Sequence, residues 1–223
     1  MNKSLQKILE ISDKIHPVFI EQNGQTLQYF RELGIGYLPA ATEDNILYDK
    51  DYYESYKIKA ATNMGRALTV TRSFYTYQCT DGNHNICDIG VGSGDFVREY
   101  DCFGYDINPF AVKDLQKEGK FIDPYFDESI DYLTFWDSLE HINDPSEILS
   151  RPTCGVILSM PIYKSFEDTI NSKHFKPNEH IWYFTDAGLK TFMRAHGYEH
   201  RTFTNIETLL GRESINSYYF EKI

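Results

Sequence analysis

The residues that could carry out chemistry gather first around a glycine-rich run at 86–97. Three glycines at alternate positions, Gly90, Gly92 and Gly94, follow an apolar segment that contains Asp88 near its end. Glycine allows positive φ angles and lets a ligand approach the main chain closely. The first N–H groups of a following helix have no internal partners and can bind polar ligand groups. The run therefore predicts a strand, a tight loop and a helix that together hold a ligand.

The acid before the glycines indicates which ligand fits. A dinucleotide site typically has the spacing Gly-x-Gly-x-x-Gly and binds a pyrophosphate, which Asp88 would repel. The spacing here is Gly-x-Gly-x-Gly. S-adenosylmethionine carries a sulfonium and an ammonium against one carboxylate, so acids around its site attract it. We expect S-adenosylmethionine as the cofactor, and an oxidoreductase that binds a nicotinamide dinucleotide is the alternative.

Asp106, at the end of a second short apolar segment, is the second anchor. It lies 18 residues after Asp88, close to the interval of about 20 residues between a glycine loop and a ribose-binding acid. A carboxylate there can accept hydrogen bonds from two ribose hydroxyls. The pair Asn108-Pro109 is typical of a helix start. A glycine-rich turn can form without a ligand. The glycines, both acids and the second strand follow one another in the order and spacing of a nucleoside site, which favours a cofactor site.

These segments resemble the class I S-adenosylmethionine-dependent methyltransferases. Residues 88–94 match the first motif of that family, and Asp106 with Asn108-Pro109 matches the second. Residues 132–145, which include the run EHINDP, resemble the fourth-strand region of small-molecule and quinone-type members. The resemblance covers about residues 85–198, and a looser one to uncharacterised phage and environmental methyltransferases extends over nearly the whole chain.

The resemblance implies an α/β, Rossmann-like fold with seven mostly parallel strands, an antiparallel last strand, and helices on both faces. Residues 61–223 would form this core, and residues 1–60 a lead or lid segment packed on it. Helices are expected at 4–15, 26–33, 63–77, 110–119 and from 185 to 197. Strands are expected at 86–89, 102–105, near 121–125, at 130–135, 154–161, 198–205 and 217–221. The segment 162–178 is expected to be a lid or acceptor loop.

The composition fits one such domain, because 223 residues suffice for a single α/β core. No apolar run approaches membrane-spanning length and the first residues lack a signal peptide, so we expect a cytoplasmic protein without membrane contact, in the host cytoplasm if it is phage-encoded. The four cysteines lack C-x-x-C spacing, which favours reduced thiols and no metal site. The net charge of -11 disfavours duplex nucleic acid and favours a small-molecule acceptor, while the oligomeric state is not indicated.

Four further residues are expected beside the cofactor at the carboxyl ends of the strands. Ile107 adjoins the ribose-binding acid, and Trp136 and Asp137 follow the fourth strand, where ligands of open α/β sheets bind. Asp123 corresponds to an acid that holds the adenine edge in related enzymes. Its other interpretation is turn formation before a proline.

The helix expected at 63–77 adds a cationic candidate. Arg66 and Arg72 both lie on it, and an arginine fork matches the two oxygens of the cofactor carboxylate. We choose Arg66, although such arginines more often are solvated or pair with a surface acid. Four tyrosines between 48 and 56 either line an acceptor pocket and cap the adenine or fill a gap beside the sheet.

Two histidines are the candidates for acid–base chemistry. Methyl transfer is an in-line displacement, so the protein mainly aligns donor and acceptor, and a base helps when the acceptor is a hydroxyl or an ammonium. His141 and His180 are expected in neighbouring loops at the crevice. Each also has a structural interpretation, because His141 can fix its loop and His180 can orient the next helix. We expect methyl transfer to oxygen or nitrogen, and a catalytically silent cofactor-binding module is a further alternative.

Overall fold

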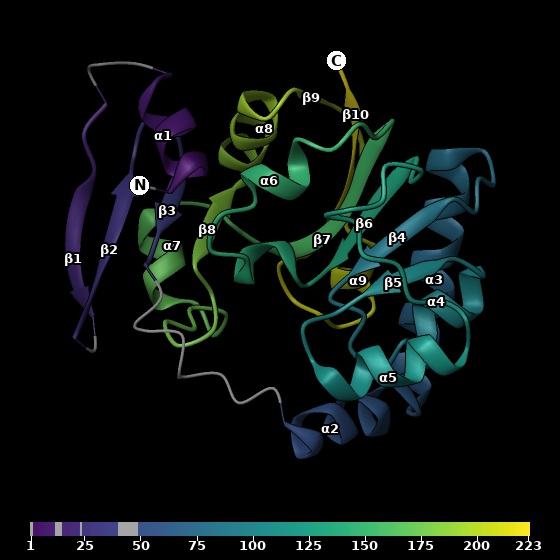
Figure 1. The fold of residues 1–223 in the computed structure, drawn as a ribbon. Coiled ribbons are helices and arrows are strands. Elements are labelled where there is room, and N and C mark those ends of the chain that lie inside the picture. Colours follow the sequence, from purple (N-terminus) through teal and green to yellow (C-terminus); the bar gives the residue numbers. More distant parts are fainter. Residues whose placement is uncertain (1, 12–14, 23, 40–48) are drawn as a thin grey trace.

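A computed structural model describes residues 2–11, 15–22, 24–39 and 49–223 (Figure 1). Its helices, with one 3-10 turn η1, are α1 (Lys3–Leu9), α2 (Lys50–Ala60), α3 (Asn63–Thr80), α4 (Asp95–Tyr100), α5 (Pro109–Lys117), η1 (Leu139–His141), α6 (Ser146–Leu149), α7 (Phe166–Asn171), α8 (Asp186–Ala195) and α9 (Ile206–Leu209). Its strands are β1 (Val18–Gln22), β2 (Gln25–Phe30), β3 (Ile35–Tyr37), β4 (Ile86–Ile89), β5 (Phe103–Tyr105), β6 (Tyr132–Trp136), β7 (Gly155–Tyr163), β8 (Trp182–Thr185), β9 (Tyr198–Thr204) and β10 (Ile215–Lys222).

One mixed sheet connects the strands of the described ranges. The strand order is β1-β2-β3-β8-β7-β6-β4-β5, and β10 pairs with both β7 and β9. Strands β5, β4, β6 and β7 are parallel, whereas β10 runs antiparallel between β7 and β9. The Rossmann-like α/β fold with its antiparallel last strand is therefore confirmed. The expected number of seven strands is too low, since the sheet has 10.

The additional strands arise largely in the first 37 residues. The expected helix at 26–33 is wrong, because residues 25–30 form β2, which pairs antiparallel with β1. Leu27 and Tyr29 are buried on one side of this strand, and Gly24 in the preceding turn has φ 78. The dipeptide Asn23-Gly24 is a typical hairpin connection and is the signal that the helical interpretation missed. Strand β3 then pairs with β8 and joins this hairpin to the core sheet.

Other boundaries also differ from the expectations. The helix expected at 4–15 is described as α1 and ends at Leu9, and residues 12–14, like Tyr48 of the tyrosine group, lie outside the described residues. The third core strand is reduced to one bridge between Gly104 and Phe121. The expected loop 162–178 is shorter, because β7 continues to Tyr163 and α7 follows at 166–171.

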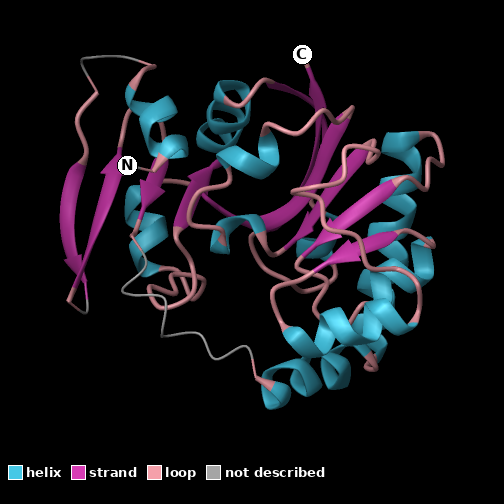
Figure 2. Ribbon diagram, in the orientation of Figure 1, coloured by secondary structure: helices cyan, strands magenta, loops and turns pink. Residues whose placement is uncertain are grey.

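Helices cover both faces of the core sheet (Figure 2). Alternate strand residues point to opposite faces of the sheet and form two hydrophobic cores. Leu133 and Leu158 cluster with residues of α6 and α8, whereas Ile86 and Ile157 cluster with residues of α3 and α4. This layering places the carboxyl ends of β4, β5, β6 and β7 along one edge, where ligands of such sheets bind. Among the helices described, none is both long and apolar enough to cross a bilayer.

Candidate active site

The glycine loop after β4 has the backbone conformation that glycine permits. Gly90, Gly92 and Gly94 have φ angles of 78, 55 and 77°. A Cβ atom on Gly90 would lie 2.7 Å from Cβ of Ser138, and one on Gly92 would lie 2.9 Å from a ring carbon of Tyr56. Side chains at these positions are therefore excluded both by backbone strain and by close neighbours.

The Asp106 carboxylate lies against this loop. One oxygen accepts a hydrogen bond from the Gly92 N–H at 3.3 Å, and the other accepts one from the Asn108 N–H at 2.8 Å. Burial raises the pKa of Asp106, while these N–H groups oppose the shift. Ile107 beside it is 63% exposed. The structure thus brings together the glycines and the second acid, as the sequence predicted.

Asp88 lies inside the sheet beneath the loop. Its side chain accepts a hydrogen bond from the Thr134 hydroxyl at 2.7 Å, and the residue is 2% exposed. Burial raises the pKa of Asp88 to about 7, although the hydrogen bond from Thr134 and the charge of Arg72 lower it. Asp88 therefore supports the end of β4 from within the protein.

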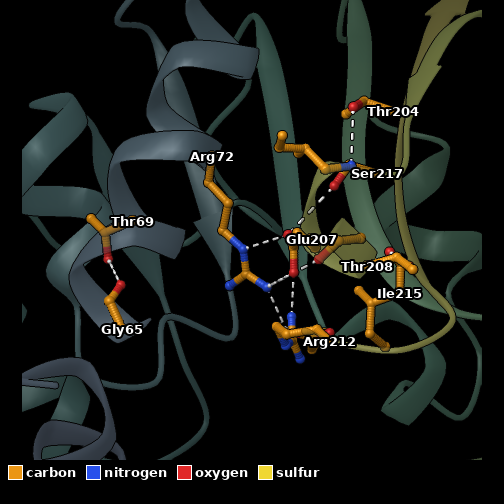
Figure 3. A network of polar contacts seen from close by, with 12 residues as sticks. Gly65, Thr69, Arg72, Thr204, Glu207, Thr208, Arg212, Ile215 and Ser217 are labelled. Carbon is orange, nitrogen blue, oxygen red and sulfur yellow. Dashed lines mark hydrogen bonds and ion pairs between the residues drawn. The ribbon is translucent and has the colours of Figure 1, made fainter. Parts of the chain in front are cut away.

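Asp137 lies at the end of β6 in a left-handed conformation, with φ 58°. Arg72 Nη2 contacts its Oδ2 at 2.6 Å, and Arg212 Nη1 contacts the same oxygen at 2.9 Å. Burial opposes ionisation, but the two guanidinium groups outweigh it and lower the pKa of Asp137 to about 2. Arg72 also donates to both oxygens of Glu207, which is fully buried (Figure 3). Asp137 is therefore an ionised group fixed by two cations.

Arg66, the arginine chosen from the sequence, lines a cavity with Ser93 of the glycine loop, but its guanidinium is bonded to neighbouring residues of the chain. The guanidinium of Arg66 donates to Ala61 O and, at 2.6 Å, to Asn63 Oδ1 on its own helix, and the residue is exposed. It is Arg72 that reaches the strand ends, with Glu207 and Arg212 as partners for which the sequence has no local signal. Binding of the cofactor carboxylate by Arg66 stays a prediction that these contacts do not support.

Unpaired polar atoms mark the end of β6. Among the described residues, Trp136 Nε1, Asp137 Oδ1 and Glu140 Oε2 are buried without a hydrogen-bond partner. The Trp136 ring itself packs in the core, 5.0 Å from the Arg72 guanidinium and 5.4 Å from the Phe96 ring. Buried polar atoms without a hydrogen-bond partner lower stability. Three of them within residues 136–140 therefore indicate a place where a ligand or water forms hydrogen bonds with the protein.

The two candidate histidines meet, as expected from the topology. Their rings are 4.7 Å apart between centroids and nearly perpendicular, at 89°. Burial lowers the pKa of His141, and burial together with the charges of His141 and Lys176 lowers the pKa of His180 to about 3. A group with so low a pKa is a weak base at neutral pH. The role of His141 and His180 as catalytic bases stays a prediction.

Asp123 forms a turn beside β5. Its carboxylate accepts a hydrogen bond from the Tyr125 N–H at 3.0 Å, and its carbonyl accepts one from the Phe126 N–H at 3.2 Å. These contacts agree with the turn interpretation. The contact of Asp123 with an adenine edge stays a prediction.

Solved structures similar to this chain share its fold. A possible histamine N-methyltransferase from Thermotoga maritima has a TM-score of 0.55 and 17% identity, covering 78% of this chain and 97% of that one. A magnesium protoporphyrin IX methyltransferase from Synechocystis, solved with bound S-adenosylhomocysteine, has a TM-score of 0.56 and 15% identity. The similarity covers 79% of this chain and 96% of that one. A 1,6-didemethyltoxoflavin-N1-methyltransferase from Burkholderia thailandensis, solved with 1,6-didemethyltoxoflavin and S-adenosylhomocysteine, has a TM-score of 0.54 and 13% identity. The similarity covers 93% of this chain and 99% of that one.

The sequence comparison identifies the family. Residues 59–202, more than half of the chain, match the sequence model of the family described as methyltransferase domain. The matched part contains the glycine loop, Asp106, Asp137 and both histidines. No curated protein matches the chain. Because this match covers more than half of the chain and includes the glycine loop and Asp106, the chain belongs to the methyltransferase domain family.

Proposed function

We propose that the protein transfers a methyl group from S-adenosylmethionine to an oxygen or nitrogen of a small-molecule acceptor. The observation that carries the proposal is the glycine loop with positive φ angles beside the Asp106 carboxylate, which accepts hydrogen bonds from Gly92 and Asn108. Membership of the methyltransferase domain family supports it. Two of the similar structures hold S-adenosylhomocysteine, the product that this cofactor leaves.

The described residues fit S-adenosylmethionine. The glycines at 90, 92 and 94 allow the positive φ angles that give the loop its tight bend between β4 and α4. Asp106 has oxygen lone pairs left to accept ribose hydroxyls. Ile107 exposes an apolar side chain next to it, suited to an adenine ring. Asp106, the acid that follows β5, favours a cationic ligand over the pyrophosphate of a dinucleotide.

The bound cofactor supplies a methyl group on a positively charged sulfur. The residues of this chain then have to align the acceptor and limit water. Tyr56 of α2 lies on Gly92, and its hydroxyl is 3.1 Å from that of Tyr52, so α2 covers the loop on this side. Asp137 is ionised, and its Oδ1 is unpaired among the described residues, so it would accept a hydrogen bond from an acceptor O–H or N–H and orient it.

A small acceptor is the class that the whole chain supports. The net charge of -11 opposes a polyanionic duplex. By their names, the similar proteins from Synechocystis and Burkholderia thailandensis act on a porphyrin and on a toxoflavin precursor. We infer an acceptor of this small-molecule class.

The ribose role of Asp106 is tested by Asp106→Asn, which keeps the size of the side chain and removes its charge. Calorimetric titration should show the affinity for S-adenosylhomocysteine falling about 10- to 100-fold, because charge-assisted hydrogen bonds to the ribose are weakened. The matched control is Glu199→Gln on β9, which removes a charge paired with Arg194 of α8 and should leave the affinity unchanged. Equal affinities in Asp106→Asn and the unaltered protein would overturn the assignment.

A further inference from the structure

Glu140, His141 and His180 form a cluster of three side chains that can each bind a metal ion. A carboxylate oxygen of Glu140 and one ring nitrogen of each histidine all lie within 4.8 Å of one another. Glu140 is 2% exposed and His180 is 5% exposed. Two imidazoles and one carboxylate are the ligand set of many catalytic sites for divalent transition metals. The set is therefore chemically complete for a three-ligand metal site.

One oxygen of the buried Glu140 carboxyl is available to bind a cation. Its Oε2 is buried and has no hydrogen-bond partner among the described residues. A carboxylate oxygen enclosed by protein without a donor is costly. A metal ion between Glu140 and the two imidazoles would supply the absent positive partner.

The bonding of His141 leaves a nitrogen for a metal. Its Nδ1 is 2.8 Å from the carbonyl oxygen of Glu179. Because a carbonyl can only accept, the proton is on Nδ1 and the lone pair is on Nε2. Histidines that bind metal ions commonly donate their other N–H to a carbonyl or carboxylate in this way, which fixes the ring orientation.

The backbone holds the two segments of the cluster together. The Ile181 N–H donates to Glu140 O at 2.8 Å, and the Trp182 indole N–H donates to Ile142 O at 3.0 Å. The turn after β6 and the segment before β8 are thus bonded directly, although the histidines are far apart in sequence. A metal ion would meet an arrangement that is already formed.

We propose that Glu140, His141 and His180 bind one divalent first-row transition-metal ion. Three protein ligands leave coordination positions for water or for an oxygen of a small molecule. The site begins with Glu140, three residues after Asp137, at the edge of the sheet where an acceptor is expected. Metal binding here does not depend on S-adenosylmethionine binding, so each of the two proposals can fail alone.

The test uses the whole chain, freed of metal by a chelator and titrated with Zn²⁺ by calorimetry and with Co²⁺ by visible absorption. One ion should bind per chain, and Co²⁺ should give ligand-field bands of nitrogen and oxygen coordination. Glu140→Gln and His180→Ala should each weaken Zn²⁺ binding at least about tenfold, since each removes one of three ligands. The matched control is His174→Ala, on the same segment but bonded to Glu213 O, and it should bind Zn²⁺ like the unaltered protein.

Two results would overturn the proposal. One is an unaltered protein that binds neither Zn²⁺ nor Co²⁺ in a ratio of one per chain. The other is equal Zn²⁺ affinity in the unaltered protein and in both ligand variants, with circular dichroism showing all of them folded. Should the variants fail to fold, the Co²⁺ spectrum of the unaltered protein decides, because a spectrum of hexaaqua Co²⁺ would contradict the site.

Discussion

Asp137, Arg72 and Arg212 form, with the buried Glu207, a set of alternating charges at the end of β6. Arg72 bridges the two acids, and Arg212 contacts both of them as well. Buried ion pairs add little net stability compared with apolar packing, yet removal of one partner leaves an uncompensated charge. The set also holds Asp137 in its left-handed conformation, of a kind that occurs preferentially at functional sites.

Arg72→Met should therefore destabilise the protein strongly. It leaves two acids, Asp137 and the 0% exposed Glu207, to share the charge of Arg212, and a loss of about 3 to 5 kcal/mol in the free energy of unfolding is expected. Urea unfolding measures this loss. Arg194→Met is the control, because its 68% exposed side chain pairs with Glu199 on the surface and its loss should be below about 1 kcal/mol. Similar losses for both variants would contradict the account of this set.

Asp88 predicts a dependence of stability on pH. Burial raises its pKa to about 7, so between about pH 4 and pH 7 the folded protein binds a proton that the unfolded chain releases. The contribution of this carboxyl to the free energy of unfolding is therefore fully present at the lower pH and is lost as the pH rises to 7. Asp88→Asn should remove that slope, amounting to a few kcal/mol across the range. Urea unfolding at several pH values compares the two proteins, and parallel curves would refute the assignment.

At the scale of elements, the site could be predicted where local patterns specify it. The glycine loop, the strands around it and the acid after β5 follow from glycine spacing, apolar runs and the Asn108-Pro109 helix start. The helix predicted at 63–77 is observed as α3 at 63–80, and Thr185 caps α8 as expected. These features are encoded within a few residues of one another.

The remaining features depend on contacts between distant parts of the chain. Strand β3 pairs Tyr37 with Trp182, a register with no local signal. Arg72 bonds to Glu207 across 135 positions, so no motif could distinguish it from Arg66. The cluster of Glu140 with two histidines likewise forms only when two loops meet, and cysteine spacing gave no information about it.

The join between the first strands and the core depends on Gly188. A Cβ atom at this position, in the first turn of α8, would lie 2.1 Å from Gly34 O, which accepts a hydrogen bond from the Thr185 N–H. Gly188→Ala should force α8 away from the turn before β3 and lower the free energy of unfolding by about 2 to 3 kcal/mol. In Gly119→Ala only the positive φ of 66° opposes the methyl group, and a loss of about 1 kcal/mol is expected. Equal losses of unfolding free energy for the two variants, measured in urea, would show that close contact between α8 and the turn before β3 is not needed for stability.

At the scale of the molecule, a core sheet of parallel strands is extended by an antiparallel hairpin (Figure 1). The division into a lead segment of residues 1–60 and a core of 61–223 stays a proposal, since β3 and β8 continue one sheet across it. The parallel strands end beside the glycine loop, Asp106 and Asp137. This arrangement, in an acidic chain, accounts for a site that favours a cationic nucleoside over a pyrophosphate.

The most direct test of that claim is calorimetric titration of the intact protein with S-adenosylhomocysteine and, separately, with NADH. S-adenosylhomocysteine lacks the methyl group but keeps the ribose, adenine and amino acid groups that the loop and Asp106 would hold. We predict one S-adenosylhomocysteine bound per chain and no saturable binding of NADH. Binding of NADH without binding of S-adenosylhomocysteine would contradict it.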